Sequence, residues 1–191
     1  MRSFIWFLVL CSIASPALSA ENDTFRYGVQ TSLNNYKIDD PAGSTAVGSG
    51  LSVSGIALLN VGRESRVMFN LDKDSYSLAG TTTNVGQNVS SIGGGVSYQN
   101  MLRVTRNWKP WIGVGLGYAS ATYKNRFTMM TPGQPYTYLY ADRTATDTAL
   151  LLNTDSEWVI NRDWDIGLQA QFAKTFSDKS STFRVGIYLV Y

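Results

Sequence analysis

The stretch Phe183-Arg184-Val185-Gly186-Ile187-Tyr188-Leu189-Val190-Tyr191 forms the last nine residues of the sequence. Side chains of an extended strand point alternately to its two faces, so the odd-numbered residues of this stretch share one face. That face is entirely apolar or aromatic and consists of Phe183, Val185, Ile187, Leu189 and Tyr191. The opposite face carries Arg184, Gly186 and Tyr188. The pattern predicts a β-strand with one apolar side and one more polar side.

Seven earlier segments show the same alternation with a period of two residues. They lie within residues 25–34, 51–61, 66–72, 91–102, 112–118, 150–158 and 164–172. Ile56, Leu58 and Leu151 are exceptions, because they place apolar side chains on the otherwise polar face. No segment between residues 21 and 191 shows a competing helical period, so the sequence predicts an all-β fold of eight strands.

The connections between these segments alternate in length. Three are tight and polar, at residues 62–65, 103–107 and 161–163. Longer connections are expected at residues 37–48, 79–88 and 124–143, with a short one at 177–180. Tight turns at one end and long loops at the other predict antiparallel strands that run up and down around a barrel. In such a barrel the last strand pairs with residues 25–33 to close the wall.

The amino-terminal residues read as a secretory signal peptide. Arg2 precedes an apolar run over residues 4–10, and small residues follow over 14–20. We therefore expect a cleaved signal peptide at 1–20 and one barrel domain at 21–191. Cys11 invites a lipoprotein interpretation, but Leu10 before it is a poor match to the small residue that lipoprotein processing requires. Cys11 is also the only cysteine, so the mature chain can form no disulfide.

The chemistry of the two faces indicates which of them lies outside. The polar face is rich in Gly, Ser, Gln and Asn, whereas a solvated outer face usually carries many charges. The tryptophans Trp108, Trp111, Trp158 and Trp164 all lie near the tight turns, where an aromatic girdle would meet the membrane surface. We therefore predict an eight-stranded antiparallel up-and-down transmembrane β-barrel. The alternative is a soluble periplasmic ligand-binding barrel with the apolar face inside.

Charged residues on the polar face predict an interior polar network. Eight strands enclose just enough space for side chains, and a charge in that space is costly unless it is paired. The expected members are Arg26, Arg66, Asp72, Asp155, Glu157, Asp165 and Arg184. We expect arginine–carboxylate pairs among them.

Composition argues against several classes of function. The chain has 16 basic and 14 acidic residues, and this near-neutral balance gives no sign of nucleic-acid binding. It contains no histidine, which excludes a Ser-His-Asp arrangement and a histidine-bearing metal site. We predict a non-enzymatic protein without a cofactor or a bound metal.

The residues 107–118, with the pattern Gly113-x-Gly115-x-Gly117, resemble the small outer-membrane barrel superfamily that includes the OmpA membrane domain and the OmpX and Ail proteins. The run 161–166 and the last strand are similar to the same family. The resemblance implies the outer membrane of a Gram-negative cell, contact with its lipid and lipopolysaccharide, and insertion by the barrel assembly machinery. It also implies an assembly signal, formed by Arg184, Gly186, Leu189 and Tyr191.

The same resemblance implies that outer loops carry the function, as adhesion, another surface interaction or envelope integrity. The residues expected to contact a host or cell-surface ligand are Tyr136, Tyr138, Tyr140 and Arg143. The alternative is a conduit of the OmpW sort, which passes small hydrophobic molecules through the barrel wall.

Overall fold

The computed structural model describes residues 25–39, 45–80, 86–103, 107–125, 143–161, 163–177 and 180–191. These residues form one closed barrel in which every strand is antiparallel to both neighbours. The strands are β1 (Phe25–Asp39), β2 (Thr45–Asn60), β3 (Ser65–Leu78), β4 (Gln87–Met101), β5 (Trp108–Asn125), β6 (Arg143–Val159), β7 (Asp165–Thr175) and β8 (Ser181–Val190). The predicted eight-stranded up-and-down barrel is confirmed. The signal peptide predicted at 1–20 lies outside the described residues.

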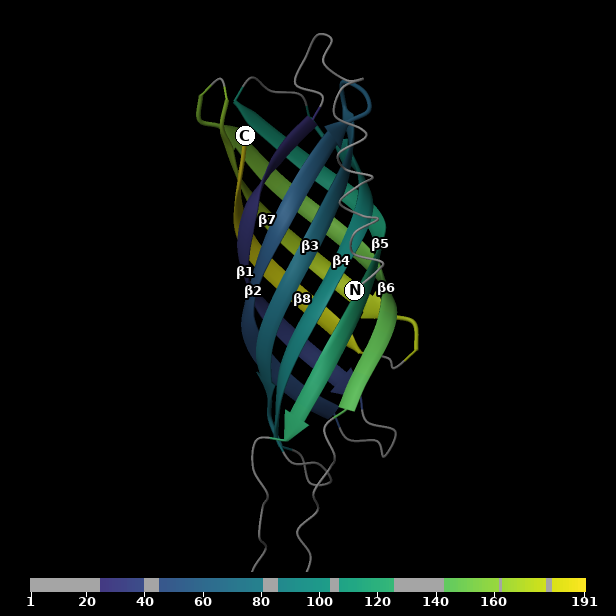
Figure 1. Cartoon of the computed structure of the whole chain (residues 1–191). Helices are drawn as coiled ribbons and strands as arrows, with labels where there is room; N and C mark the ends of the chain where they lie inside the picture. Colours follow the sequence, from purple (N-terminus) through teal and green to yellow (C-terminus); the bar gives the residue numbers. More distant parts are fainter. Residues whose placement is uncertain are drawn as a thin grey trace, which may run out of the picture.

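The last strand closes the barrel wall as predicted. β8 pairs with β1 from Lys37↔Ser181 to Gly28↔Val190, and Tyr27 and Tyr191 exchange backbone hydrogen bonds of 3.1 and 2.9 Å. Figure 1 shows the tilted strands, with the C-terminus marking the rim of the tight turns at the top of the view. Because both edges of each strand are paired, the sheet presents no open edge.

The two faces of the wall have the predicted orientation. Large apolar side chains point outward; Leu33 and Ile187, for example, are 69% and 55% exposed. Polar side chains such as Gln30, Asn34 and Gln99 are buried inside. A soluble ligand-binding barrel needs the reverse arrangement, so that alternative is wrong. The described residues contain no helix long and apolar enough to cross a membrane.

The three apolar exceptions to the alternation lie inside the barrel. Ile56 and Leu58 from β2 join Met68, Tyr188 and Val190 in a buried apolar cluster beside the tight turns. Leu151 from β6 is also buried. Each keeps the inward direction that the period of two assigns to its position, so the barrel interior combines a small apolar cluster with the polar side chains.

The first long loop is shorter than the sequence predicts. We expected it at residues 37–48, but Lys37 pairs with Val47 and Asp39 pairs with Thr45 in the β1–β2 ladder. Thr45 and Val47 are β-branched and continue the ladder because such residues favour strands. The strands have up to 18 residues, in β5, whereas crossing a membrane needs about 9–11.

A side-chain hydrogen bond fixes the turn between β6 and β7. The Asn161 Oδ1 atom accepts bonds from the backbone N–H groups of Asp163 and Trp164, at 2.9 and 3.0 Å. The backbone N–H of Ile160 donates to the Trp164 carbonyl at 3.0 Å. An asparagine that replaces backbone partners in this way favours a tight reversal of the chain.

Candidate functional site

The charged side chains inside the barrel form two groups, one beside the tight turns and one toward the loops. The turn-side group centres on Arg66, the second residue of β3. Its guanidinium donates to the Glu157 Oε2 atom at 2.6 Å and to the Asp155 Oδ2 atom at 2.8 Å. The Arg66 side chain is 1% exposed and both carboxylate side chains are 0% exposed. Asp155 and Glu157 share a face because they are two residues apart on β6.

Neutral groups complete the hydrogen bonding around Arg66. Its Nε atom donates to the Gln99 Oε1 atom at 2.6 Å, and Gln99 in turn donates to Asp155 at 2.7 Å. The hydroxyl of Tyr188 donates to Glu157 at 3.1 Å. The Arg66 guanidinium carbon also lies 4.1 Å from the ring centroid of Trp111, a cation–π contact.

Two more cations complete this group at its edge. The Arg26 Nη atoms lie 3.1 Å from Glu157 and 2.9 Å from Asp165. Lys109 Nζ lies 3.0 Å from Asp165 and 3.6 Å from Glu157. Three cations therefore face three carboxylates, which offsets the cost of placing charge in a narrow interior.

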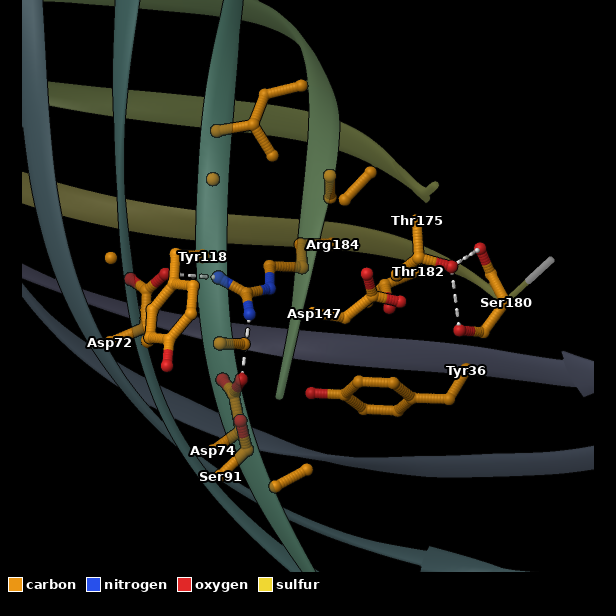
Figure 2. Close-up of a pocket in the computed structure, with 18 of the residues that line it drawn as sticks. Tyr36, Asp72, Asp74, Ser91, Tyr118, Asp147, Thr175, Ser180, Thr182 and Arg184 are labelled. Atoms are coloured by element: carbon orange, nitrogen blue, oxygen red, sulfur yellow. Dashed lines mark hydrogen bonds and ion pairs between the residues drawn. The ribbon is translucent and has the colours of Figure 1, made fainter. Parts of the chain in front are cut away.

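The loop-side group centres on Arg184 of β8. Its Nη1 and Nη2 atoms each lie 2.8 Å from a carboxylate, that of Asp72 and that of Asp74 respectively. Figure 2 shows the Arg184 guanidinium between these carboxylates, which both come from β3. Asn34 donates to Asp74 at 3.3 Å and to the Tyr36 hydroxyl at 3.0 Å.

Amide side chains lie between the two charged groups, since Gln169 pairs with Asp155 and Gln171 pairs with Arg184 in the ladders. Gln30 donates to Gln169 at 2.8 Å, and Gln171 donates to Asn153 at 2.9 Å. All four are buried and come from β1, β6 and β7. Gln171 and Asn153 are ladder partners on the neighbouring strands β7 and β6, whereas the Gln30–Gln169 bond reaches from β1 to β7 across β8.

A cavity of about 120 Å³ lies on the loop side of the Arg184 group. Its wall includes the buried rings of Tyr36, Tyr76 and Tyr123, of which Tyr36 and Tyr76 stack with centroids 3.5 Å apart. Asp147 also lines it, and its Oδ1 atom accepts a 2.7 Å bond from the Thr148 N–H. Figure 2 shows Asp147, Tyr36 and Arg184 around this space.

The structure places all seven expected network residues inside the barrel, and it pairs every one of them. Sequence reasoning missed Asp74 and Lys109. The period of two contains the signal for Asp74, since it follows Asp72 by two residues and so shares its face. Lys109 shares the face of Trp111 in the same way, and both point into the barrel.

The predicted aromatic girdle is wrong at one position. Trp108, Trp158 and Trp164 point outward and are 38–41% exposed, whereas Trp111 is 3% exposed and lies under Arg66. Outward residues of β5 have even numbers, as Ile112 shows, so position 111 faces inward. The alternation of side chains along the strand decides whether a residue points inward or outward, and nearness to a turn does not.

The residues predicted for the assembly signal and for loop interactions lie at different places in the barrel. Tyr191 is exposed at the turn-side rim, where its ring centroid lies 5.2 Å from that of Trp164. Leu189 points outward, while Arg184 and Gly186 face inward. Arg143 begins β6 at the loop side, with its guanidinium carbon 4.5 Å from the Tyr123 ring centroid. Tyr136, Tyr138 and Tyr140 lie outside the described residues.

The chemistry of the interior is that of a polar plug. The charged side chains of the Arg66 and Arg184 groups are engaged with one another, and the lining contains no histidine that could act as a base toward a serine or tyrosine hydroxyl. Within the described ranges, no group of three or more His, Cys, Asp or Glu residues is arranged to hold a metal ion.

Comparisons with known proteins agree with this geometry. A model of the outer membrane protein beta-barrel domain family matches residues 5–189. The crystal structure of neisserial surface protein A has a TM-score of 0.57 at 15% identity, over 86% of this chain and 95% of that one. A search of curated proteins by sequence found no match.

Two further barrels are similar at lower scores. The attachment invasion locus protein Ail of Yersinia pestis has a TM-score of 0.48 at 11% identity, over 87% of this chain and 98% of that one. The N-terminal barrel domain of Pseudomonas aeruginosa OprF has a TM-score of 0.39 at 10% identity, over 86% and 97% of the two chains. At these identities the likeness concerns the fold.

Proposed function

The chain belongs to the outer membrane protein beta-barrel family, and from this membership we propose that it is a non-enzymatic surface protein exported by a cleaved signal peptide. Its barrel anchors the protein in the outer membrane of a Gram-negative cell. The long loops above the membrane bind a partner at the cell surface, which serves adhesion or envelope integrity.

The observation that carries this proposal is the closed interior. Arg66, Glu157 and Gln99 come from three different strands and meet in the lumen with exposures of 1% or less. A lumen filled by paired side chains is an anchor rather than a passage. The rim and the loops are then the parts of the molecule that a surface partner can reach.

The residues of the outer surface support a further part of the proposal, which is that the loop-side ends of the strands stand above the membrane. Toward the loops, the outward residues of every strand change from apolar to Ser, Thr, Asn or Lys, with Val47 as an exception. On β5, for instance, Ser120 follows Tyr118, and on β6 Thr148 follows Leu150. Because lipid contacts only the apolar part, the strands continue beyond the membrane and hold the loop bases above it.

The wall favours the anchor over a conduit of the OmpW sort. Sideways passage through the wall requires a gap between two strands. The described residues of all eight neighbouring strand pairs form continuous ladders. The cavity of about 120 Å³ reaches the loop side but is bounded on the turn side by the Arg184 group.

The longest loop provides the test. We expect that deleting Pro132–Pro135 abolishes binding of the expressing cells to host-cell monolayers and to immobilised matrix glycoproteins, relative to cells that lack the protein. The deletion should leave intact the heat-dependent gel shift and the outer-membrane fractionation, because the barrel strands are unchanged. The matched control removes four residues, 81–84, from the loop between β3 and β4.

Two results would contradict the proposal. One is wild-type binding by the Pro132–Pro135 deletion and by a variant in which all the long loops are shortened. The other is recovery of the folded protein in the soluble periplasmic fraction, which would remove the membrane anchor altogether.

A further inference from the structure

One carboxylate inside the barrel has a buried oxygen atom without a partner. Asp147 of β6 lines the cavity of about 120 Å³, and its Oδ1 atom accepts the bond from the Thr148 N–H. Its Oδ2 atom is buried and accepts no hydrogen bond from the residues that the structure describes. A buried polar atom of this kind is costly unless another group satisfies it.

A second unpaired atom belongs to a residue of the same cavity. Arg184 also lines it, and the Nε atom of its guanidinium is buried with no acceptor among the described residues. The two Nη atoms are engaged by Asp72 and Asp74, so the Nε–H is the donor that is left. Figure 2 shows the Asp147 and Arg184 side chains bordering one space. The lining therefore offers one acceptor and one donor.

Small residues on two neighbouring strands create this space. Ala145 and Ala149 flank Asp147 at the inward positions of β6, and Ala119 is the ladder partner of Asp147 on β5. All three alanines line the cavity. Because a cavity of about 150 Å³ holds a benzene ring, this one takes a ligand of about six non-hydrogen atoms or fewer.

The charge of the lining favours a cation. Three carboxylates, those of Asp72, Asp74 and Asp147, border the cavity, whereas Arg184 is the one cation among the described lining residues. Arg143 lies at the rim, against the Tyr123 ring. An excess of one sign of charge in a partly enclosed space attracts the opposite sign.

The aromatic rings narrow the class of cation. Tyr36, Tyr76 and Tyr123 line the cavity and are buried. The face of such a ring attracts an ammonium group, and the ring also packs against alkyl carbon. An organic ammonium ion therefore uses both the free carboxylate oxygen and the rings, whereas a hydrated metal ion uses only the carboxylate.

We infer that this cavity binds a small amino alcohol, that is, a primary ammonium ion that also carries a hydroxyl group. The ammonium donates to the Asp147 Oδ2 atom, and the hydroxyl oxygen accepts from the Arg184 Nε–H. The short alkyl chain between them packs against the tyrosine rings. This site goes beyond the proposed function, because its residues belong to the barrel strands and not to the loops.

The test is a titration of the folded mature chain in detergent micelles, in which NMR follows the backbone amide signals of Asp147 and Thr148. The probe is 4-amino-1-butanol. Butanediol of the same length replaces its ammonium by a neutral hydroxyl, and pentylamine replaces its hydroxyl by a methyl group. The amide signal of Asp163, an exposed residue of a tight turn, reports binding elsewhere on the molecule.

Each of the two analogues leaves one buried atom unsatisfied, so we expect both to bind about tenfold more weakly than the amino alcohol. The variant D147N keeps the shape of the side chain and removes its charge, which should weaken binding of the amino alcohol about tenfold or more. Asp147 forms no ion pair with the described residues, so D147N should fold normally. The matched control is D163N, which should bind like the wild type.

A second variant tests the space rather than the charge. A149L fills the cavity beside Asp147 and retains the carboxylate, so it should abolish the saturable shifts. Equal affinity for butanediol or for pentylamine would overturn the inference, as would full binding by D147N or an equal loss in D163N. Shifts at Asp163 that parallel those at Thr148 would also overturn it and would leave water as the partner of the two unpaired atoms.

Discussion

Arg66 shows how one buried cation depends on its partners. It contacts two carboxylates that are themselves inaccessible, whereas Arg184 is 15% exposed and lies near a cavity. Removing one member of a buried pair leaves the other charge uncompensated, which costs far more than losing an exposed pair. The two arginines therefore allow a graded test of the interior network.

We expect Arg66→Met to lower the free energy of unfolding by about 3–5 kcal/mol, because Glu157 and Asp155 then remain buried without their partner. Arg184→Leu should weaken the barrel by less, since the cavity gives water access to Asp72 and Asp74. Urea unfolding in lipid vesicles, followed by tryptophan fluorescence, measures both. The control is Arg103→Met at an exposed turn, and stability in Arg66→Met equal to that control would reject the network.

Trp111 shows that the alternation of side chains along a strand predicts the direction of a residue better than its nearness to a turn does. Its nearness to a turn placed it in the girdle, yet its odd number places it opposite Ile112 and therefore inside. Asp74 was missed although it follows Asp72 by two positions. In both cases the alternation of side chains along the strand, which is a local property, was enough to assign the side chain to the interior.

The pairing of β7 with β8 depends on a glycine. Gly167 lies opposite Tyr188 in the ladder, and a Cβ atom at position 167 would overlap the Tyr188 ring. The absence of a side chain gives the ring room to lie over β7, where its hydroxyl reaches Glu157. The absence of a Cβ atom at Gly167 therefore allows Tyr188 of the closing strand to contact the charged group beside the tight turns.

Gly167→Val should displace the Tyr188 ring and destabilise the barrel by about 1–3 kcal/mol, as overpacked interiors do. The matched control is Gly55→Val on β2, where an added Cβ meets no atom within 4 Å. The fraction that migrates as the folded form on unheated gels, measured against temperature, reports both changes. Equal melting of the two variants would show that the Tyr188 packing contributes little.

At the scale of the whole molecule, closure and filling act together. The strand ladders leave no unpaired strand edge in the described sheet, and the interior side chains fill the space that the wall encloses. We expect the protein to give no steady conductance in planar lipid bilayers, where a porin with an open lumen serves as the control. Reproducible current steps of one size would contradict the plugged interior and revive the conduit alternative.

The sequence by itself determined the number of strands, their order, the face of each that lies outside, and the tight or long character of most connections. These features follow from a period of two and from turn chemistry, both of which are local. The tertiary structure alone decided which charges meet, because Arg26 and Glu157 are 131 positions apart and only the register and closure of the barrel bring them together. The register likewise decided the extension of the β1–β2 ladder into the predicted loop. Such properties depend on how eight tilted strands align, which no single segment specifies.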